Sequence, residues 1–129
     1  MSVGVLLVSH LGIGSALLDS ARRILRVLPL KVQALELPWD HDCLDPCRRQ
    51  AAALLRELDE GEGVLVLADL YGASPFNAVQ SLEPGRALVK VSGLNLPMLL
   101  RVCTYPEKSL NELADIARDG GRAGVVRDA

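Results

Sequence analysis

One segment of the chain constrains the fold more than any other, because it runs from a buried strand into a polar turn. Val64–Ala68 is a run of five apolar residues, and Asp69 follows it directly. A strand that is apolar on both faces is typical of a parallel sheet covered on both sides by helices. Pro75 and the small residues before it predict a tight turn and the start of a helix. Because ligands bind at the carboxyl ends of strands in open α/β sheets, we expect Asp69 to lie at a functional edge.

The same pattern of strand, polar turn and helix occurs earlier in the chain. An apolar run predicts a strand at 3–8, which ends in Ser9 and His10, and a partly alternating pattern predicts a shorter strand at 32–37. Apolar residues three or four positions apart then predict helices packed on a sheet. The first apolar stripe is Leu17, Ala21, Ile24 and Leu28, with Ser15 as the N-cap and Pro29 as the stop; the second is Leu44, Cys47, Ala51, Leu54 and Leu58, with Asp45 as the N-cap.

The second half of the chain continues this alternation. A short helix is expected at 75–82, a fourth strand at 87–91, and a further helix from Leu96. Apolar positions from Leu110 to Ala117 predict a last helix, which Gly120 and Gly121 are expected to end. Residues 123–126 are then expected to form a fifth, short strand.

These elements predict a single α/β domain over residues 1–129 with a doubly wound, mostly parallel sheet of four to five strands. We predict the strand order 2-1-3-4, which is common among doubly wound folds, with the C-terminal strand in addition. In this order the first and third strands are neighbours. His10 and Asp69 would therefore lie side by side at the switch point of the sheet.

Composition excludes several classes of function. The net charge is −2 and there is no basic block, which argues against nucleic-acid binding. No apolar run approaches the roughly 20 residues of a membrane span, and the N-terminus does not resemble a signal peptide. The three cysteines are too few for a disulfide framework. We therefore expect a cytoplasmic protein that is not inserted in the membrane.

The residues at the predicted switch point can support phosphoryl chemistry. A neutral imidazole such as that of His10 is a good nucleophile, and Asp69 can accept a hydrogen bond that fixes its tautomer. The backbone N–H groups of Gly72, Ala73 and Ser74, at a helix start, can hold phosphate oxygens. Each residue also has a simpler interpretation: a polar residue at a strand edge, a turn residue or a helix cap. Together at one edge they favour reversible phosphorylation of the histidine.

Two other sites can be drawn from the sequence. A hydrolase would use Ser74 as nucleophile, His10 as base and Asp69 as orienting acid, but the Gly-x-Ser-x-Gly elbow is absent. A metal site could be drawn from His41, Cys43 and Cys47, but their spacing matches no common zinc pattern. We predict that the protein uses no metal and no cofactor.

The motifs resemble those of a known family. Ser9-His10 after the first strand, Asp69-Leu-Tyr-Gly-Ala-Ser-Pro-Phe-Asn77 and Ser92-Gly-Leu-Asn-Leu-Pro-Met98 are similar, in order and spacing, to the mannose-type enzyme IIA domain. That domain belongs to the bacterial phosphoenolpyruvate-dependent sugar phosphotransferase system. The related dihydroxyacetone-kinase subunit shares the fold and an early histidine, but the Ser-Pro-Phe-Asn turn fits the mannose type better.

The resemblance implies specific roles. His10 matches the histidine that takes a phosphoryl group from the phosphocarrier HPr and passes it to a IIB sugar-transport component, and Asp69 matches the acid that orients it. Ser74 matches a phosphate-contacting hydroxyl, and Asn77 and Asn95 match segments that shape the site. The family further implies a homodimer in which the C-terminal strand exchanges between subunits. A stand-alone IIA protein that signals phosphorylation state to a regulatory partner is the alternative.

Overall fold

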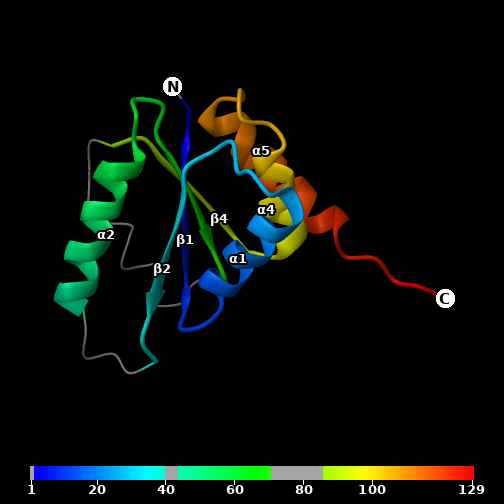
Figure 1. The fold of residues 1–129 in the computed structure, drawn as a ribbon, viewed down its shortest axis with the longest axis horizontal. Coiled ribbons are helices and arrows are strands. Elements are labelled where there is room, and N and C mark those ends of the chain that lie inside the picture. The colour runs from blue at the N-terminus through cyan, green and yellow to red at the C-terminus, as the bar shows by residue number, and fades with distance from the viewer. Residues whose placement is uncertain (1, 40–43, 71–85) are drawn as a thin grey trace.

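A computed structural model of the chain describes residues 2–39, 44–70 and 86–129. Its centre is a four-stranded, wholly parallel sheet in the order β2-β1-β3-β4, with helices on both faces (Figure 1). The predicted α/β class and strand order are therefore confirmed. The elements, in chain order, are β1 (Gly4–His10), α1 (Gly14–Leu25), β2 (Val32–Leu37), α2 (Leu44–Leu58), β3 (Val64–Ala68), β4 (Leu88–Ser92), α4 (Leu96–Cys103) and α5 (Leu110–Ala123).

The sheet separates two hydrophobic clusters, because successive residues of a strand point to opposite faces. Leu6 and Val8 of β1 pack with the buried side of α2, which among the described helices is the one that covers this face of the sheet (Figure 1). Val5 and Leu7 pack with α1, α4 and α5 on the other face. All four of these side chains are completely buried. β1 and β3 are thus covered on both sides, as the apolar run Val64–Ala68 predicts.

Helix α1 differs from its prediction at both ends. It begins at Gly14 with Ile13 as the N-cap residue, so the predicted cap at Ser15 is wrong. It ends at Leu25, which is before Pro29, the predicted stop. The next residue, Arg26, has a positive φ of 64°. Ile24 is 55% exposed, whereas its neighbour Leu25 packs against the core. The apolar stripe of α1 therefore lies one position away from the predicted one at this turn.

The start of α2 also differs from its prediction. The helix begins at Leu44, so Asp45 lies inside it and is not its cap. Its buried stripe is Cys47, Ala51, Leu55 and Leu58, while Leu54 is only partly buried. The short helix predicted at 75–82 lies outside the described residues.

Helix α5 continues through the two glycines that were expected to end it. Gly120 and Gly121 are buried and helical, because they lie against α4 where a side chain has no room. A Cβ at Gly120 would lie 2.8 Å from the Arg101 side chain, and one at Gly121 would lie 2.8 Å from that of Met98. Close helix packing therefore outweighs the weak helix propensity of glycine.

The fifth strand predicted at 123–126 is wrong for the single chain. Ala123 ends α5, and residues 125–129 have no strand conformation. The extended α5 carries this tail away from the sheet (Figure 1). Val125 and Val126 are therefore 79% and 76% exposed.

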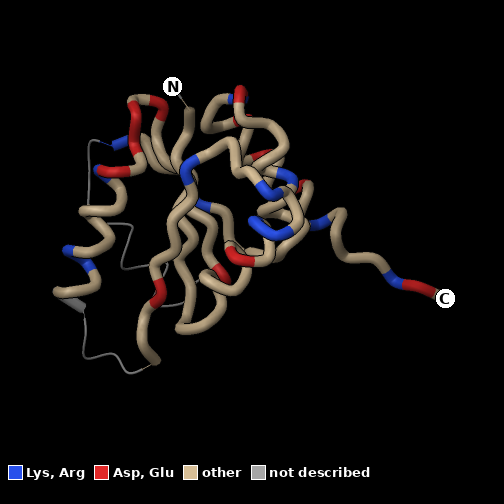
Figure 2. Tube along the Cα trace, viewed as in Figure 1, with Lys and Arg blue, Asp and Glu red and all other residues tan. Residues whose placement is uncertain are grey.

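An ion pair fixes the loop that leads into β3. Asp59 accepts hydrogen bonds from the N–H groups of Gly61 and Gly63, and Arg86 donates to it at 2.7 Å. The acidic segment at residues 57–62 lies beside the N-terminus in Figure 2. Burial, the largest single influence, raises the pKa of Asp59, but the two N–H groups and Arg86 together outweigh it and lower the pKa below its usual value.

Replacing Asp59 by asparagine is expected to lower the free energy of unfolding at neutral pH by about 1–3 kcal/mol, since a charged hydrogen bond is lost. The lowered pKa means that this contribution is present above the ordinary aspartate pKa of about 3.9 and disappears as pH falls through the lower folded value. Urea denaturation from pH 7 to pH 3 should show the two proteins converging in acid. A stability difference that does not shrink with falling pH would contradict this account.

Candidate functional site

His10 and Asp69 meet at the carboxyl edge of the two central strands. His10 is the last residue of β1, and Asp69 follows the last residue of β3. The two strands are hydrogen-bonded neighbours, and the N–H of Asp69 donates to the carbonyl of Val8 at 3.2 Å. The strand order therefore brings together two residues that are far apart in the sequence.

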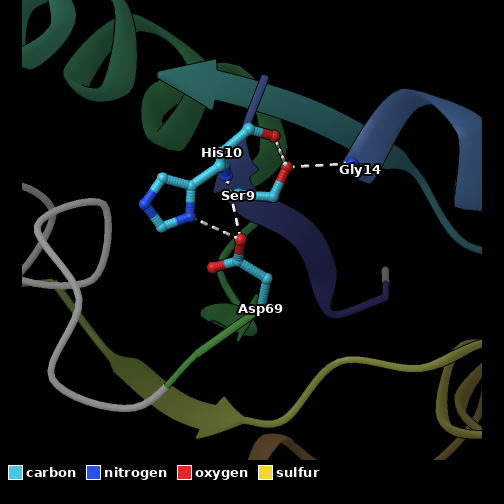
Figure 3. Close-up of polar contacts among 4 residues, drawn as sticks. All are labelled: Ser9, His10, Gly14 and Asp69. Carbon is cyan, nitrogen blue, oxygen red and sulfur yellow. Dashed lines mark hydrogen bonds and ion pairs between the residues drawn. The ribbon is translucent and has the colours of Figure 1, made fainter. Parts of the chain in front are cut away.

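A single carboxylate oxygen holds both the backbone and the ring of His10. Oδ2 of Asp69 lies 2.8 Å from Nδ1 of His10 and accepts the backbone N–H of His10 at 3.0 Å (Figure 3). The side chains are mostly buried, with 19% of His10 and 9% of Asp69 exposed. Because an ionised carboxylate only accepts hydrogen bonds, Nδ1 must carry a proton. In the neutral ring, Nε2 then has the free lone pair.

Ser9 connects the end of β1 to the start of α1. Its side chain is completely buried, and its hydroxyl donates to the carbonyl of His10 and accepts the N–H of Gly14, both at 2.8 Å (Figure 3). This hydroxyl satisfies one of the free N–H groups at the helix start. The sequence marks Ser9 only as a polar residue at a strand end, and its role depends on a turn geometry that no pattern of residues specifies.

Replacing Ser9 by alanine is expected to lower the free energy of unfolding by about 1–3 kcal/mol, because the buried N–H of Gly14 loses its acceptor. Chemical denaturation would measure the change. Replacing the exposed Ser15, whose hydroxyl donates to Glu36, offers a control with an expected cost below about 1 kcal/mol. Equal losses in the two variants would show that the buried hydroxyl has no special role.

Trp39 completes the observed surroundings of the His10 ring, and sequence reasoning missed it. The two rings are stacked, with centroids 4.4 Å apart and planes 19° from parallel. Trp39 lies just beyond the end of β2, and Leu37 at that end pairs with His10 in the sheet. Applying the rule about strand ends to β2 as well as to β1 and β3 would have identified it.

The other predicted site residues are placed as follows. Asn95 is the N-cap of α4: its Oδ1 accepts the N–H of Met98 at 2.8 Å, and its Nδ2 donates to the carbonyl of Gly121. The adjacent N–H of Leu94 donates to Ala68 at the end of β3, so this turn lies at the same edge as Asp69. The remaining predicted residues belong to the segment that follows Asp69 in the sequence and lie outside the described residues. They are the phosphate-binding residues Gly72, Ala73 and Ser74 and the site-shaping residue Asn77.

Comparison with known protein families places most of the chain in one of them. Residues 4–117 match the model of the PTS system fructose IIA component, EIIA-man. The chain belongs to this family. The match includes β1 with His10, β3 with Asp69 and most of α5.

Individual relatives agree with this assignment. The mannose-specific EIIAB component of Escherichia coli K12 is 38% identical over 76 residues, which are 57% of this chain and 24% of that protein. The matched part thus spans about a quarter of the curated relative. Two solved structures are similar over nearly their whole length. One is a mannose/sorbose-specific IIA subunit from Enterococcus faecalis, with 28% identity and a TM-score of 0.86 over 100% of this chain and 96% of that one. The other is a IIA protein associated with the fucose utilization operon of Streptococcus pneumoniae, with 25% identity and a TM-score of 0.78 over 98% of this chain and 96% of that one.

The described part of this IIA chain contains no group of three histidine, cysteine or acidic side chains arranged to hold a metal ion. Of the residues considered for a metal site, His41 and Cys43 lie outside that part, and Cys47 is buried. Burial raises the pKa of the Cys103 thiol to about 11, so this thiol stays protonated and unreactive. Among the described helices, none is long and apolar enough to cross a membrane.

Proposed function

We propose that this chain is a phosphoryl carrier of a sugar phosphotransferase system, with His10 as the phosphorylated residue. The observation that carries the proposal is the contact of Asp69 with Nδ1 of His10, which leaves Nε2 as the nucleophilic nitrogen. Membership of the IIA family supports the reaction class. The donor would be phospho-HPr and the acceptor a IIB component.

In the proposed reaction, the Nε2 lone pair of His10 attacks the phosphorus of the donor phosphohistidine. The N–P bond of the donor breaks, and its electron pair returns to the donor ring. The proton on Nδ1 stays in place, so the phosphorylated His10 ring carries a positive charge next to the Asp69 carboxylate. Transfer to the IIB component reverses these steps. As predicted from the sequence, the N–H groups of Gly72, Ala73 and Ser74 would hold the phosphate oxygens.

The surface around His10 supports a protein, rather than a small molecule, as the exchange partner. Leu11, Trp39 and Leu70 follow the ends of β1, β2 and β3, and they are 58%, 66% and 61% exposed. Exposed apolar side chains grouped at one edge are typical of protein interaction sites. A carrier that exchanges phosphoryl groups with two proteins in turn needs such a surface.

Incubation with phosphoenolpyruvate, enzyme I and HPr tests the proposal directly. We expect one acid-labile phosphate per chain, located on His10 by peptide mapping. No phosphate, or a phosphate on another residue, would contradict the proposal. Adding a purified IIB component then distinguishes the two fates of the phosphate, because a carrier passes it on and a purely regulatory IIA protein retains it.

We also propose that the chain is a homodimer. Val125 and Val126 form an exposed apolar tail beyond α5, which is suited to add a strand to a second copy of the chain. A monomer mass in light scattering at micromolar concentration would contradict this proposal.

A further inference from the structure

We infer that Trp39 stabilises the phosphorylated state of His10 by placing its π face on the imidazole ring. This inference rests on the proposed function, because it concerns the ring that carries the phosphate. It begins from the ring stack, with centroids 4.4 Å apart and planes 19° from parallel. Trp39 is the only tryptophan of the chain.

The position of Trp39 is not explained by the hydrophobic core. Its side chain is 66% exposed, although it is the largest apolar side chain in the sequence. His10, by contrast, is only 19% exposed. Among the described residues, the ring contact of this exposed indole is the one with His10. Asp69 holds the edge of that ring through Nδ1, and Trp39 covers one of its faces.

Phosphorylation changes the charge of the ring that Trp39 covers. With a proton on Nδ1 and a phosphoryl group on Nε2, the imidazole becomes a cation. A cation within about 6 Å of an indole centroid is attracted to the negative face of the indole, and the stack is within this distance. When the phosphate leaves, the ring becomes neutral again, and a neutral ring gains less from the same contact. Trp39 should therefore favour the phosphorylated form over the free form.

Loss of the phosphate to water gives the contact a measurable consequence. Water adds to phosphorus, the electron pair of the Nε2–P bond returns to Nε2, and inorganic phosphate leaves. The positive charge on the ring disappears during this step, so a group that stabilises the charge slows it. At an exposed site a cation–π contact corresponds to a factor of about two- to fivefold. We expect phosphohistidine in the Trp39→Ala variant to decay faster by this factor.

Phosphoramidate makes the test independent of any protein partner. Nε2 attacks its phosphorus and ammonia leaves with the P–N electron pair, so His10 is labelled without HPr. Decay would be followed by ³¹P NMR at fixed pH in the wild type and in Trp39→Phe, Trp39→Leu and Trp39→Ala. We expect Trp39→Phe to retain most of the protection, and Trp39→Leu, which keeps an apolar cover without a π face, to lose it. Tyr105→Ala, at another exposed aromatic residue, is the matched control and should decay like the wild type.

Fluorescence of the single tryptophan tests the contact before any phosphorylation. Removing the imidazole in His10→Ala should change the Trp39 emission, and phosphoramidate labelling of the wild type should change it again. Unchanged emission in His10→Ala, equal decay in Trp39→Leu and Trp39→Phe, wild-type decay in Trp39→Ala, or failure of phosphoramidate to label His10 would each overturn the inference. Failure of phospho-HPr alone to label His10 would overturn the proposed function instead.

Discussion

Replacing Asp69 by asparagine is expected to lower the rate of His10 phosphorylation by up to about 10⁴-fold, the loss that follows when the carboxylate orienting a catalytic histidine becomes a carboxamide. The carboxylate oxygen that contacts Nδ1 of His10 can only accept a hydrogen bond, which keeps the proton on Nδ1 and the lone pair on Nε2. A carboxamide can present its N–H₂ group at the same place. The ring then turns to the tautomer with the proton on Nε2, which has no lone pair to attack phosphorus.

The Asp69→Asn rate would be measured with both phospho-HPr and phosphoramidate as donors. The tautomer explanation requires the rate to fall with both donors, since the fault lies in the ring and not in partner docking. Leu70→Ala is the matched control, because Leu70 is the next residue and is 61% exposed. It should slow transfer from phospho-HPr more than transfer from phosphoramidate. A fall in Asp69→Asn confined to phospho-HPr would contradict the tautomer explanation.

The central part of the site was predictable because it depends on simple features of the chain. Two apolar runs each end in a polar residue, and the common doubly wound order makes their strands neighbours. The contact between His10 and Asp69 follows from these two facts, and the structure confirms it. The bounds of β2 and β3 were also predictable, because Pro38 follows the partly alternating segment of β2 and Asp69 follows the apolar run of β3.

The contacts of Ser9 and Trp39 were not predictable from these features. Each depends on the local path of the chain after a strand: a turn that brings Gly14 onto the Ser9 hydroxyl, and one that lays an exposed indole on His10. The glycines of α5 show a different limit. Two adjacent glycines such as Gly120 and Gly121 are typical of the end of a helix, but their lack of a side chain also allows close packing against α4. Only the tertiary structure decides between the two uses.

Gly63 offers the largest stability effect that we expect from adding one methyl group, because two separate penalties act there. Its φ of 86° is strained for any residue with a side chain, at a cost of about 1–2 kcal/mol. A Cβ would also lie 2.8 Å from the carbonyl oxygen of Ala87 and 2.7 Å from the Leu110 side chain. Overpacking of this kind costs typically about 1–3 kcal/mol. We therefore expect Gly63→Ala to lower the free energy of unfolding by roughly 2–5 kcal/mol.

Two other glycines separate these penalties experimentally. Gly93 has a φ of 89°, but apart from its chain neighbours no atom of the described residues lies within 4 Å of the place that a Cβ would take, so Gly93→Ala should show the backbone penalty alone. Gly4 has no positive φ, but a Cβ there would collide with the carbonyl oxygen of Leu58, so Gly4→Ala should show the packing penalty alone. Urea denaturation of the three variants should give a loss at Gly63 close to the sum of the other two. A loss at Gly63 no larger than that at Gly93 would mean that the start of β3 moves aside at little cost, and that the strand leading to Asp69 is less rigidly held than its contacts indicate.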